Sequence, residues 1–379
     1  MADMMRIGIF GGGQLARMLT QAAITLGLET VIFERFADSP AGRLTRREVV
    51  GAWDEAEALA RFAEQCDLVT LENEFVDATI LATLEDRGLP VFPTAATVAV
   101  VQDKLTQKER IASAGLSVPA FQGVGSPDEV LQAGKILGWP MVLKARRNGY
   151  DGYGNATLRT AEDVGPAWER LSKGGNALLV EAWVPFVREL AVMVVRGRTG
   201  ETKAYPVVET VQRDHICHVV RVPAPLSPTE ADAATELAVN AVRAVDGIGI
   251  FGVELFALPN GQMQYNEMAP RPHNSGHYTI EACVCSQFEN HIRAVLGWPL
   301  GDVRLREPAA VMINLLGQRN GTVKPEALEA ALAIPGAHVH LYGKREARIG
   351  RKMGHVTAYG ATLAEAEARA RQAADLVAI

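Results

Sequence analysis

Two acidic residues in the second half of the sequence have the type and spacing of metal ligands. The run from Phe251 to Phe256 predicts a short strand, Asn260-Gly261 is a strong hairpin turn signal, and Gln262 to Asn266 predicts the returning strand. If Asn260 and Gly261 form the turn, counting outward places Glu254 directly opposite Glu267. Like charges opposed across two strands are destabilising, and burial would raise the cost of ionising either carboxyl group.

A bound divalent cation resolves this conflict. Together with Asn266, the two glutamates offer only oxygen ligands, which suit Mg²⁺, with Mn²⁺ as an alternative ion. Protein-bound Mg²⁺ commonly keeps waters and contacts substrate phosphates, so the hairpin predicts phosphate-binding residues elsewhere in the chain. Two acids on a solvated hairpin edge are the alternative interpretation.

Candidates for binding those phosphates precede the hairpin. An apolar strand from Gly138 to Ala145 carries Lys144, and a buried lysine needs an anionic partner. The glycine-rich segment from Gly149 to Gly154 joins this strand to the next, Ala156 to Arg159, and its backbone N–H groups could close over phosphates. A plain glycine-rich hairpin turn is the alternative.

The N-terminus offers a second kind of phosphate site. A strand from Arg6 to Phe10 leads into a glycine turn in which Gly11, Gly13 and Ala16 fit G-x-G-x-x-A, and the second strand ends at Glu34. This pattern is typical of dinucleotide sites. Glycines at a helix N-terminus also bind other phosphates or simply allow strand–helix packing, so three interpretations stay open on the pattern alone.

A basic segment near the C-terminus offers a third site. The expected strand His338 to Tyr342 leads into Gly343 to His355, where lysines and arginines gather around glycines in an otherwise acidic chain. Such a segment can bind a phosphate monoester. A solvated basic loop is the alternative.

Strands and helices alternate along the chain, which predicts an α/β protein. Glu72 and Glu74 follow the expected strand Asp67 to Leu71, where ligands bind in open α/β sheets. The expected helices are Asp54–Gln65, Val101–Ala114, Pro228–Val245, Tyr278–Leu296 and Ala361–Ile379. The other expected strands are Asn176–Val184, Leu190–Val195 and Tyr205–Val208, with Gln212 in the loop after the last.

Length and composition bound the class of protein. A chain of 379 residues should form two or three domains, and 48% hydrophobic with 22% charged residues describes a soluble α/β protein. The net charge of -6 argues against a nucleic-acid surface, and the four scattered cysteines predict buried, reduced thiols. No apolar run approaches the roughly 20 residues that span a bilayer, and the first strand begins too early for a signal peptide, so we expect a cytoplasmic protein.

These parts together resemble the ATP-grasp superfamily and, within it, the 5-(carboxyamino)imidazole ribonucleotide synthetases. The resemblance covers essentially the whole chain and is carried by Gly11–Met18 (GGGQLARM), Asp103–Lys108 (DKLTQK), Gly149–Gly154 (GYDGYG), Asn266–His277 (NEMAPRPHNSGH) and Gly350–His355 (GRKMGH). It implies an ATP-grasp fold with an N-terminal doubly wound parallel-sheet domain (1–102), a small central lid (103–182) and a C-terminal catalytic domain (183–379). It also implies a homodimer.

The activity implied by the resemblance is ATP-dependent carboxylation of 5-aminoimidazole ribonucleotide with bicarbonate, through carboxyphosphate, in purine biosynthesis. The products are 5-(carboxyamino)imidazole ribonucleotide, ADP and phosphate. Partners are then small molecules, without nucleic acid, membrane, NAD or biotin. The absence of G-x-x-x-x-G-K-[ST] and of H-R-D argues independently against P-loop and protein-kinase frameworks.

The resemblance also implies roles for particular residues. ATP phosphates would be held by Lys104, Lys144, Gly149, Tyr150, Asp151, Gly152, Tyr153 and Gly154, adenine by Glu181, Ala182, Trp183 and Val184, and ribose by Glu189 with Gln212 nearby. Glu254 and Glu267 would bind the metal, with Asn266 adjacent, and Arg271, His273, Asn274 and Ser275 would form the bicarbonate pocket. The ribonucleotide would contact Gln14, Leu15, Glu72, Lys344, Arg351 and Lys352.

One residue departs from the family pattern, because Tyr153 stands where the family usually has arginine or lysine. Arg146 or Arg147 is a candidate substitute for the missing cation. Among rival functions, formate-using glycinamide ribonucleotide transformylases usually carry Asp-Thr where this chain has Asn274-Ser275. A nucleotide sensor without turnover and an NAD oxidoreductase are the remaining alternatives.

Overall fold

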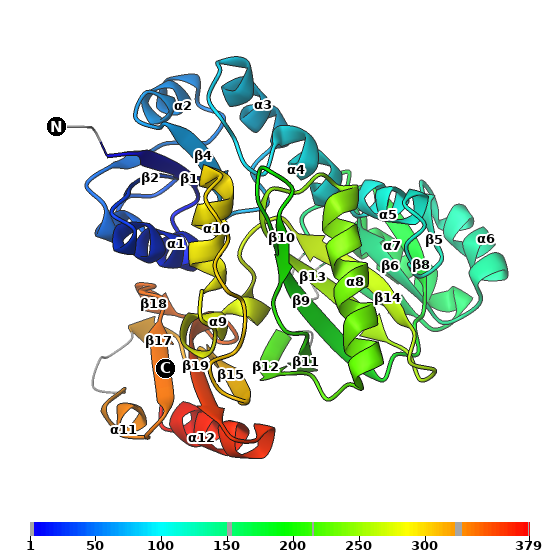
Figure 1. Cartoon of the computed structure of the whole chain (residues 1–379). Helices are drawn as coiled ribbons and strands as arrows, with labels where there is room; N and C mark the ends of the chain where they lie inside the picture. Colours follow the sequence, from blue (N-terminus) through cyan, green and yellow to red (C-terminus); the bar gives the residue numbers. More distant parts are fainter. Residues whose placement is uncertain (1–3, 150–153, 214–215, 323–327, 378) are drawn as a thin grey trace.

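The computed structural model describes residues 4–149, 154–213, 216–322, 328–377 and 379. Within them the chain is a mixed α/β protein built on a four-stranded parallel sheet, a four-stranded and a nine-stranded antiparallel sheet, and a short strand pair (Figure 1). The predicted α/β class is therefore confirmed. None of the helices in the described part of the chain has the length and apolar character needed to cross a membrane.

The N-terminal sheet is parallel and has the strand order β3-β2-β1-β4. Its strands are β1 (Arg6–Phe10), β2 (Glu29–Glu34), β3 (Glu48–Val50) and β4 (Leu68–Leu71). Alternate residues of β1 pack on opposite faces of the sheet, so two hydrophobic cores form. Helices α2 (Ala56–Ala63) and α3 (Ala78–Asp86) cover one face, and α1 (Gln14–Thr25) covers the other together with the distant helix α10 (Gln287–Leu296).

A small antiparallel sheet follows, with the order β5-β8-β6-β7. Its strands are β5 (Phe121–Val124), β6 (Met141–Ala145), β7 (Asn155–Leu158) and β8 (Leu178–Ala182), and helices α6 (Pro127–Leu137) and α7 (Val164–Leu171) pack on it. Helices α4 (Ala95–Gln102) and α5 (Lys104–Ser113) connect it to the N-terminal sheet, and η2 (Ala161–Asp163) precedes α7.

The largest sheet has nine strands in the order β14-β13-β9-β11-β12-β15-β19-β17, with β10 paired to β9. The strands are β9 (Arg188–Arg196), β10 (Thr202–Ala204), β11 (Val208–Arg213), β12 (Ile216–Val222), β13 (Gly249–Ala257), β14 (Met263–Ala269), β15 (Ala309–Leu316), β17 (Ala337–Leu341) and β19 (Lys352–Gly360). Helix α8 (Pro228–Ala244) packs on the β13–β14 hairpin, and α12 (Leu363–Asp375) packs on β15 and β19. The short elements are η1 (Gly42–Leu44), η3 (Asn274–Gly276), α9 (Thr279–Ala282), α11 (Glu329–Leu332), β16 (Gly321–Thr322) and β18 (Glu346–Ala347).

Two predicted helices are each divided in the structure. Asp103 breaks the helix expected over Val101–Ala114, because its extended backbone ends α4 while its carboxylate accepts from the N–H groups of Leu105 (3.0 Å) and Thr106 (3.3 Å) at the start of α5. The helix expected over Tyr278–Leu296 is divided into α9 and α10. Ser286 caps the second piece through the N–H of Glu289, at 3.1 Å.

Two strand assignments also need correction. Tyr205–Val208 is mostly a connection, because Pro206 has no N–H to give to a ladder, and β11 begins only at Val208. Gln212 therefore lies in a strand and not in a loop. The predicted basic loop Gly343–His355 is shorter than expected, since Lys352 already begins β19.

The β13–β14 hairpin pairs Glu254 with Glu267, as predicted, but by a different route. The connection has three residues, because Leu258 and Gln262 still pair (N–H to O, 2.9 Å) and Gly261 adopts a positive φ of 79°. This shifts the register by one residue. A bulge between Leu255 and Glu254 then leaves Asn266 as the extra residue of β14 and restores the predicted pair.

Candidate active site

A pocket of about 470 Å³ opens beside the β13–β14 hairpin. It lies where the start of α5, the N-terminal glycine turn and the turn after β14 meet. Of the residues predicted for the site, those lining the pocket are Gln14, Leu15, Lys104, Gly149, Glu254, Glu267, Arg271, His273, Asn274 and Lys352. The hairpin thus shares one cavity with residues predicted for ATP, for bicarbonate and for the ribonucleotide.

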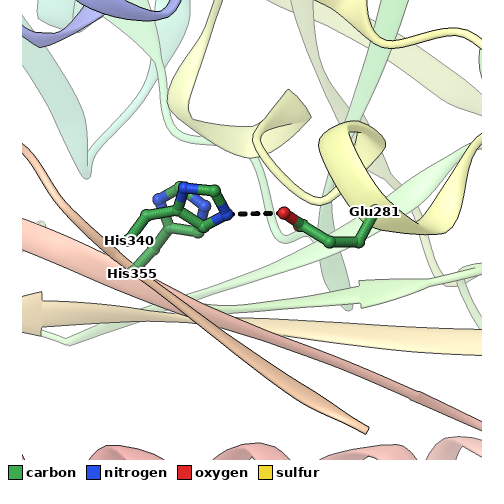
Figure 2. A group of neighbouring side chains, drawn as sticks. All are labelled: Glu281, His340 and His355. Carbon is green, nitrogen blue, oxygen red and sulfur yellow. Dashed lines mark hydrogen bonds and ion pairs between the residues drawn. The ribbon is translucent and has the colours of Figure 1, made fainter. Parts of the chain in front are cut away.

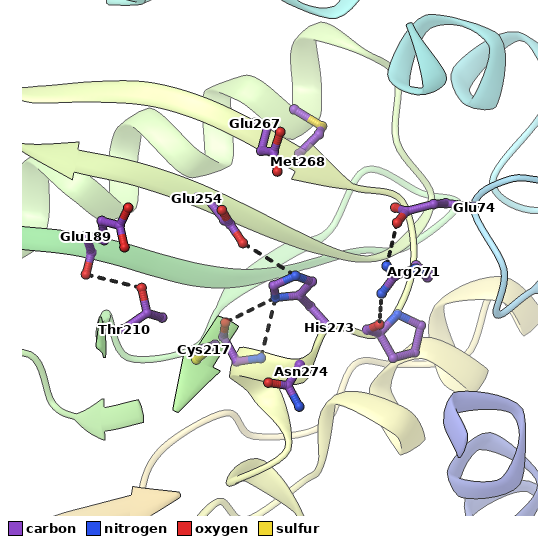
Figure 3. A network of polar contacts seen from close by, with 12 residues as sticks. Glu74, Glu189, Thr210, Cys217, Glu254, Glu267, Met268, Arg271, His273 and Asn274 are labelled. Carbon is purple, nitrogen blue, oxygen red and sulfur yellow. Dashed lines mark hydrogen bonds and ion pairs between the residues drawn. The ribbon is translucent and has the colours of Figure 1, made fainter. Parts of the chain in front are cut away.

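The two hairpin carboxylates differ in their partners, and Figure 3 shows the contact of Glu254 with His273. Glu267 receives the ammonium group of Lys104, and Glu254 lies 3.5 Å from Nε2 of His273. Burial raises the pKa of Glu254, even though Lys104 and other lysines lower it. The pKa of Lys104 falls to about 8, chiefly through burial and secondly through Lys144. A cation already stands beside one of these carboxylates, which fits an oxygen-only site for a divalent metal ion.

A cluster of buried ion pairs joins α5, β6 and β8 next to Asn266 of the hairpin, outside the pocket lining. Nζ of Lys144 lies 2.9 Å from Oε2 of Glu181, which confirms that this lysine has an anionic partner. Lys108 also contacts Glu181, at 3.3 Å, and donates to the backbone oxygen of Asn266 at 3.0 Å. Burial raises the pKa of Glu181, but the two lysines outweigh burial and hold it below its usual value. Lys108 was not predicted, although it follows Lys104 by one helical turn and so lies on the same face of α5.

The turn after β14 presents an arginine and a neutral histidine (Figure 3). Arg271 donates to Oε1 of Glu74 at 2.6 Å and to the carbonyl of Pro272 at 3.0 Å. Nδ1 of His273 accepts from the backbone N–H of Ser275 at 3.4 Å, so the neutral imidazole carries its proton on Nε2, toward Glu254. Burial, and secondly Arg271, lowers the pKa of His273 to about 3.

Backbone packing and amide pairing fix the same turn. Gly252 of β13 lies directly beneath His273, where a Cβ would collide with the His273 side chain. Asn274 exchanges two amide hydrogen bonds with Asn314 of β15, at 2.8 and 2.6 Å. Ser275 is buried beside His273 and lies outside the pocket lining. Asn314 was missed because its strand was not predicted.

The glycine turn at the N-terminus is occupied by carboxylates of the chain itself. Glu72 accepts from the N–H groups of Gly13 (3.2 Å) and Ala16 (3.4 Å), and Glu34 accepts from Gly12 N–H at 2.8 Å. Burial raises the pKa of Glu72, and these N–H groups oppose that shift. An incoming phosphate would have to displace these carboxylates, so the geometry disfavours the open phosphate and dinucleotide interpretations of this turn.

The basic segment faces the N-terminal sheet across η1. Lys352 lines the pocket, and Lys344 donates to the Lys352 carbonyl at 2.6 Å. Arg351 donates to the carbonyl of Glu346 at 3.1 Å and lies outside the pocket lining, as does Lys344. Arg345 forms an ion pair with Asp38 beside η1.

The remaining predicted ATP residues lie on β8, β9 and β11, away from the pocket lining. Trp183 is 45% exposed just after Ala182 ends β8, and Val184 follows it partly buried. Glu189 is partly buried, and burial, reinforced by Glu254, raises its pKa to about 7. The side chain of Gln212 is exposed.

Part of the glycine-rich segment lies outside the described residues, namely Tyr150, Asp151, Gly152 and Tyr153. The two ends of the segment lie close together, because a Cβ added to Gly154 would lie 3.1 Å from Cα of Gly149. Arg146 and Arg147 both line the pocket. Arg146 binds both oxygens of Asp103, at 2.9 and 2.7 Å, whereas Arg147 lies 3.7 Å from that carboxylate and is half exposed.

Known domain families cover most of the chain. The ribonucleotide synthetase preATP-grasp domain matches residues 4–102, the ATP-grasp domain matches 109–288, and the phosphoribosylaminoimidazole carboxylase C-terminal domain matches 310–369. The fold and the site therefore define an ATP-grasp enzyme, a ligase with ribonucleotide synthetase architecture.

Relatives narrow the class to one family. The N5-carboxyaminoimidazole ribonucleotide synthase of Synechococcus elongatus is 40% identical over 375 residues, which span 98% of this chain and 93% of that protein. A structure of N5-carboxyaminoimidazole synthase from Aspergillus clavatus, in complex with ADP and 5-aminoimidazole ribonucleotide, superposes with a TM-score of 0.91 at 37% identity and covers 99% of each chain. The chain belongs to the N5-carboxyaminoimidazole ribonucleotide synthase family.

Some relatives are longer. The chloroplastic phosphoribosylaminoimidazole carboxylase of Vigna aconitifolia is 41% identical over 367 residues, which cover 95% of this chain. The chain spans 65% of the length of that carboxylase.

Proposed function

We propose that this protein uses ATP and bicarbonate to carboxylate the exocyclic amine of 5-aminoimidazole ribonucleotide. The carrying observation is that one pocket joins the paired carboxylates Glu254 and Glu267, the lysines Lys104 and Lys352, and the turn from Arg271 to Asn274. This combination can place a metal-bound triphosphate next to a small anion and a phosphorylated substrate. The relative solved with ADP and 5-aminoimidazole ribonucleotide supports the same pair of ligands.

In the first step, an oxygen of bicarbonate attacks the γ-phosphorus of ATP, a P–O bond forms, and the bond to the bridging oxygen of ADP breaks. Lys104, Lys144 and the segment Gly149–Gly154 neutralise the phosphates, while Glu181–Val184, Glu189 and Gln212 receive the nucleoside. Glu254 and Glu267, with Asn266 adjacent, would hold Mg²⁺, or Mn²⁺ in its place. When bound, this ion supplies charge neutralisation for the transferring phosphoryl group.

In the second step, the exocyclic nitrogen bonds to the carboxyl carbon, either in carboxyphosphate itself or in CO₂ released from it. Phosphate leaves and takes up the proton that the nitrogen loses. Arg271, oriented by Glu74, stabilises the negative charge of the activated carboxyl group. His273 would orient Glu254 through its Nε2 proton, which lies on the nitrogen 3.5 Å from that carboxylate, because Ser275 occupies its Nδ1.

The ribonucleotide side rests on the pocket edge formed by Gln14, Leu15 and Lys352. Glu72 would orient the ribose from beneath the glycine turn, and Lys344, Arg351 and Lys352 would bind the phosphate. The same proposal includes the division of the chain into 1–102, 103–182 and 183–379 and a homodimeric state, which both rest on the family resemblance. A cytoplasmic location is also part of this proposal.

Release of ADP tests the proposed function. Protein incubated with ATP, bicarbonate and 5-aminoimidazole ribonucleotide should form ADP only when all three are present. ADP formation that ignores the ribonucleotide would refute the assignment. Replacement of bicarbonate by formate should abolish turnover, whereas activity with formate would favour the transformylase alternative.

A further inference from the structure

A cluster outside the proposed active site has the make-up of a second metal site (Figure 2). Two histidines face each other across neighbouring strands, since His340 of β17 pairs with His355 of β19. Their rings stack with centroids 4.6 Å apart and an interplanar angle of 15°. Glu281 of α9 reaches toward them, and its Oε1 lies 2.5 Å from Nε2 of His340. One ligand atom from each residue lies within 4.8 Å of the other two.

The cluster holds polar atoms for which the described residues supply no hydrogen-bond partner. Oε2 of Glu281 and Nε2 of His355 are both buried and lack a partner in the described part of the chain. His355 is 0% exposed, so bulk water does not solvate this nitrogen. The hydrogen bond between His340 and Glu281 uses Nε2 of His340 and Oε1 of Glu281, so it leaves these two buried atoms without a partner. Unsatisfied buried polar atoms are costly, and one cation between the three side chains would satisfy both.

The surroundings suit metal ligation. The hydroxyl of Tyr342 lies 3.0 Å from Nδ1 of His355 and can accept the Nδ1 proton, which leaves the Nε2 lone pair for a metal. The side chain of His340 is 30% exposed, against 12% for Glu281, so an ion and a fourth, water ligand can enter on this side. The sheet register fixes both histidines before any ion arrives.

We propose that Glu281, His340 and His355 bind one transition-metal ion of the Zn²⁺ class. Two imidazole nitrogens and one carboxylate oxygen favour Zn²⁺ over Mg²⁺, which prefers oxygen ligands only. The ion joins α9, which follows the turn at Arg271–Ser275, to β17 and β19 of the large sheet. This site is separate from the hairpin carboxylates and takes a different class of metal.

Zn²⁺ binding to the full-length protein tests the proposal. Chelator-treated protein, without nucleotide and with Mg²⁺ in excess, is titrated with Zn²⁺ against a chromophoric chelator. We expect one Zn²⁺ per chain, and a Co²⁺ complex with the strong visible absorption of a four-coordinate ion. No Zn²⁺ bound in the presence of Mg²⁺ would overturn the proposal and leave the cluster to an ordinary water molecule.

Matched variants locate the ion. His340→Gln, at the most exposed ligand, should weaken Zn²⁺ binding at least roughly tenfold, and Tyr342→Phe should weaken it by a similar factor through His355. His338→Gln changes the same residue type two positions away on β17 and should keep wild-type affinity. The double variant that combines Glu254→Gln and Glu267→Gln should also keep the wild-type affinity for Zn²⁺. Equal affinity in the His340 and His338 variants would contradict the assignment.

Discussion

The ammonium group of Lys104 contacts Glu267, so it would compete with the proposed metal ion for this carboxylate. The two carboxylates of the hairpin carry charge that the chain compensates only in part, and the lysine provides that compensation while nucleotide is absent. ATP offers the lysine another anionic partner. The metal ion should therefore bind weakly on its own and well together with the nucleotide.

Lys104→Met tests this competition. Without nucleotide, Mn²⁺ affinity should rise roughly tenfold, because a hydrogen bond to a charged group contributes about 1.5–3 kcal/mol and is no longer lost on metal binding. Free Mn²⁺, measured by electron paramagnetic resonance, reports the affinity. Lys135→Met on the surface of α6 is the control and should change nothing. Unchanged Mn²⁺ affinity in the Lys104 variant would place the ion away from Glu267.

Glu189 should make stability depend on pH. Its folded pKa of about 7 exceeds the ordinary value of 4.5, so the folded state holds the extra proton between these values and loses stability as pH rises through that window. Glu189→Gln should therefore raise the free energy of unfolding by about 1–3 kcal/mol at pH 8 and hardly at pH 5. Urea unfolding in the absence of metal and nucleotide measures this free energy at the two pH values. The exposed Glu236→Gln is the control, and an equal gain at both pH values would be inconsistent with this origin.

Sequence reasoning predicted residues of the site better than their partners. A lysine in an apolar strand demands an anion, so a partner for Lys144 was predictable. The sequence did not predict that Lys108 also pairs with Glu181, because this contact depends on how α5 packs against β8. The contacts of Glu34 and Glu72 with the glycine turn were missed for a related reason, because Glu34 ends β2 and Glu72 follows β4, and only the parallel sheet brings them together.

At the scale of elements, β13 positions the turn that follows its own hairpin. Gly252 leaves room for His273, so Gly252→Ala should push the turn from Arg271 to Ser275 out of place. We expect kcat to fall roughly hundredfold, since small displacements of reacting groups are costly, while the protein stays folded with a loss of about 1–3 kcal/mol. Steady-state kinetics and circular dichroism measure the two effects.

A matched change in α7 provides the comparison. A Cβ on Gly165 would meet nothing within 4 Å, and alanine favours helix, so Gly165→Ala should gain about 0.5–1 kcal/mol with unchanged kcat. Full activity in the Gly252 variant would show that the turn tolerates displacement of His273.

Local patterns predicted elements where a capping or breaking residue was conspicuous. The strand Arg6–Phe10 and the helix from Pro228 were predicted within a residue of their bounds. Divisions at Asp103 and before Ser286 were missed, because helical periodicity continues across them and only side-chain capping ends the helix. Strands β12, β15 and β19 were missed as well, since buried strands of a wide sheet lack a strict polar alternation.

At the scale of the whole molecule, His291 of α10 joins the two main sheets. Its Nδ1 accepts from Ile250 N–H of β13 at 3.1 Å, so its Nε2 proton points to Thr70 of β4, at 2.7 Å. No local pattern indicated that α10 covers the N-terminal sheet (Figure 1). The overall arrangement was predictable from the family resemblance alone.

His291 should weaken the molecule in acid. Burial lowers the pKa of His291 to about 3. Below pH 6.5 the unfolded chain therefore binds a proton that the folded chain does not bind, and the free energy of unfolding decreases as the pH decreases. At pH 5 this cost is about 2 kcal/mol. His291→Gln keeps one donor and one acceptor and removes that cost. Relative to wild type, the variant should therefore gain about 2 kcal/mol between pH 8 and pH 5 in urea unfolding. A constant difference across this range would contradict the prediction.

The three-residue connection and the bulge at Asn266 together set the register of the β13–β14 hairpin. Each feature shifts the register by one residue, and only together do they bring Glu254 opposite Glu267. Insertions and deletions in this region should therefore be inherited in compensating pairs, one at the tip and one beside the bulge. An insertion or deletion of one residue would turn one carboxylate to the other face of the sheet. Natural variation here is therefore constrained in the number of residues as well as in residue type.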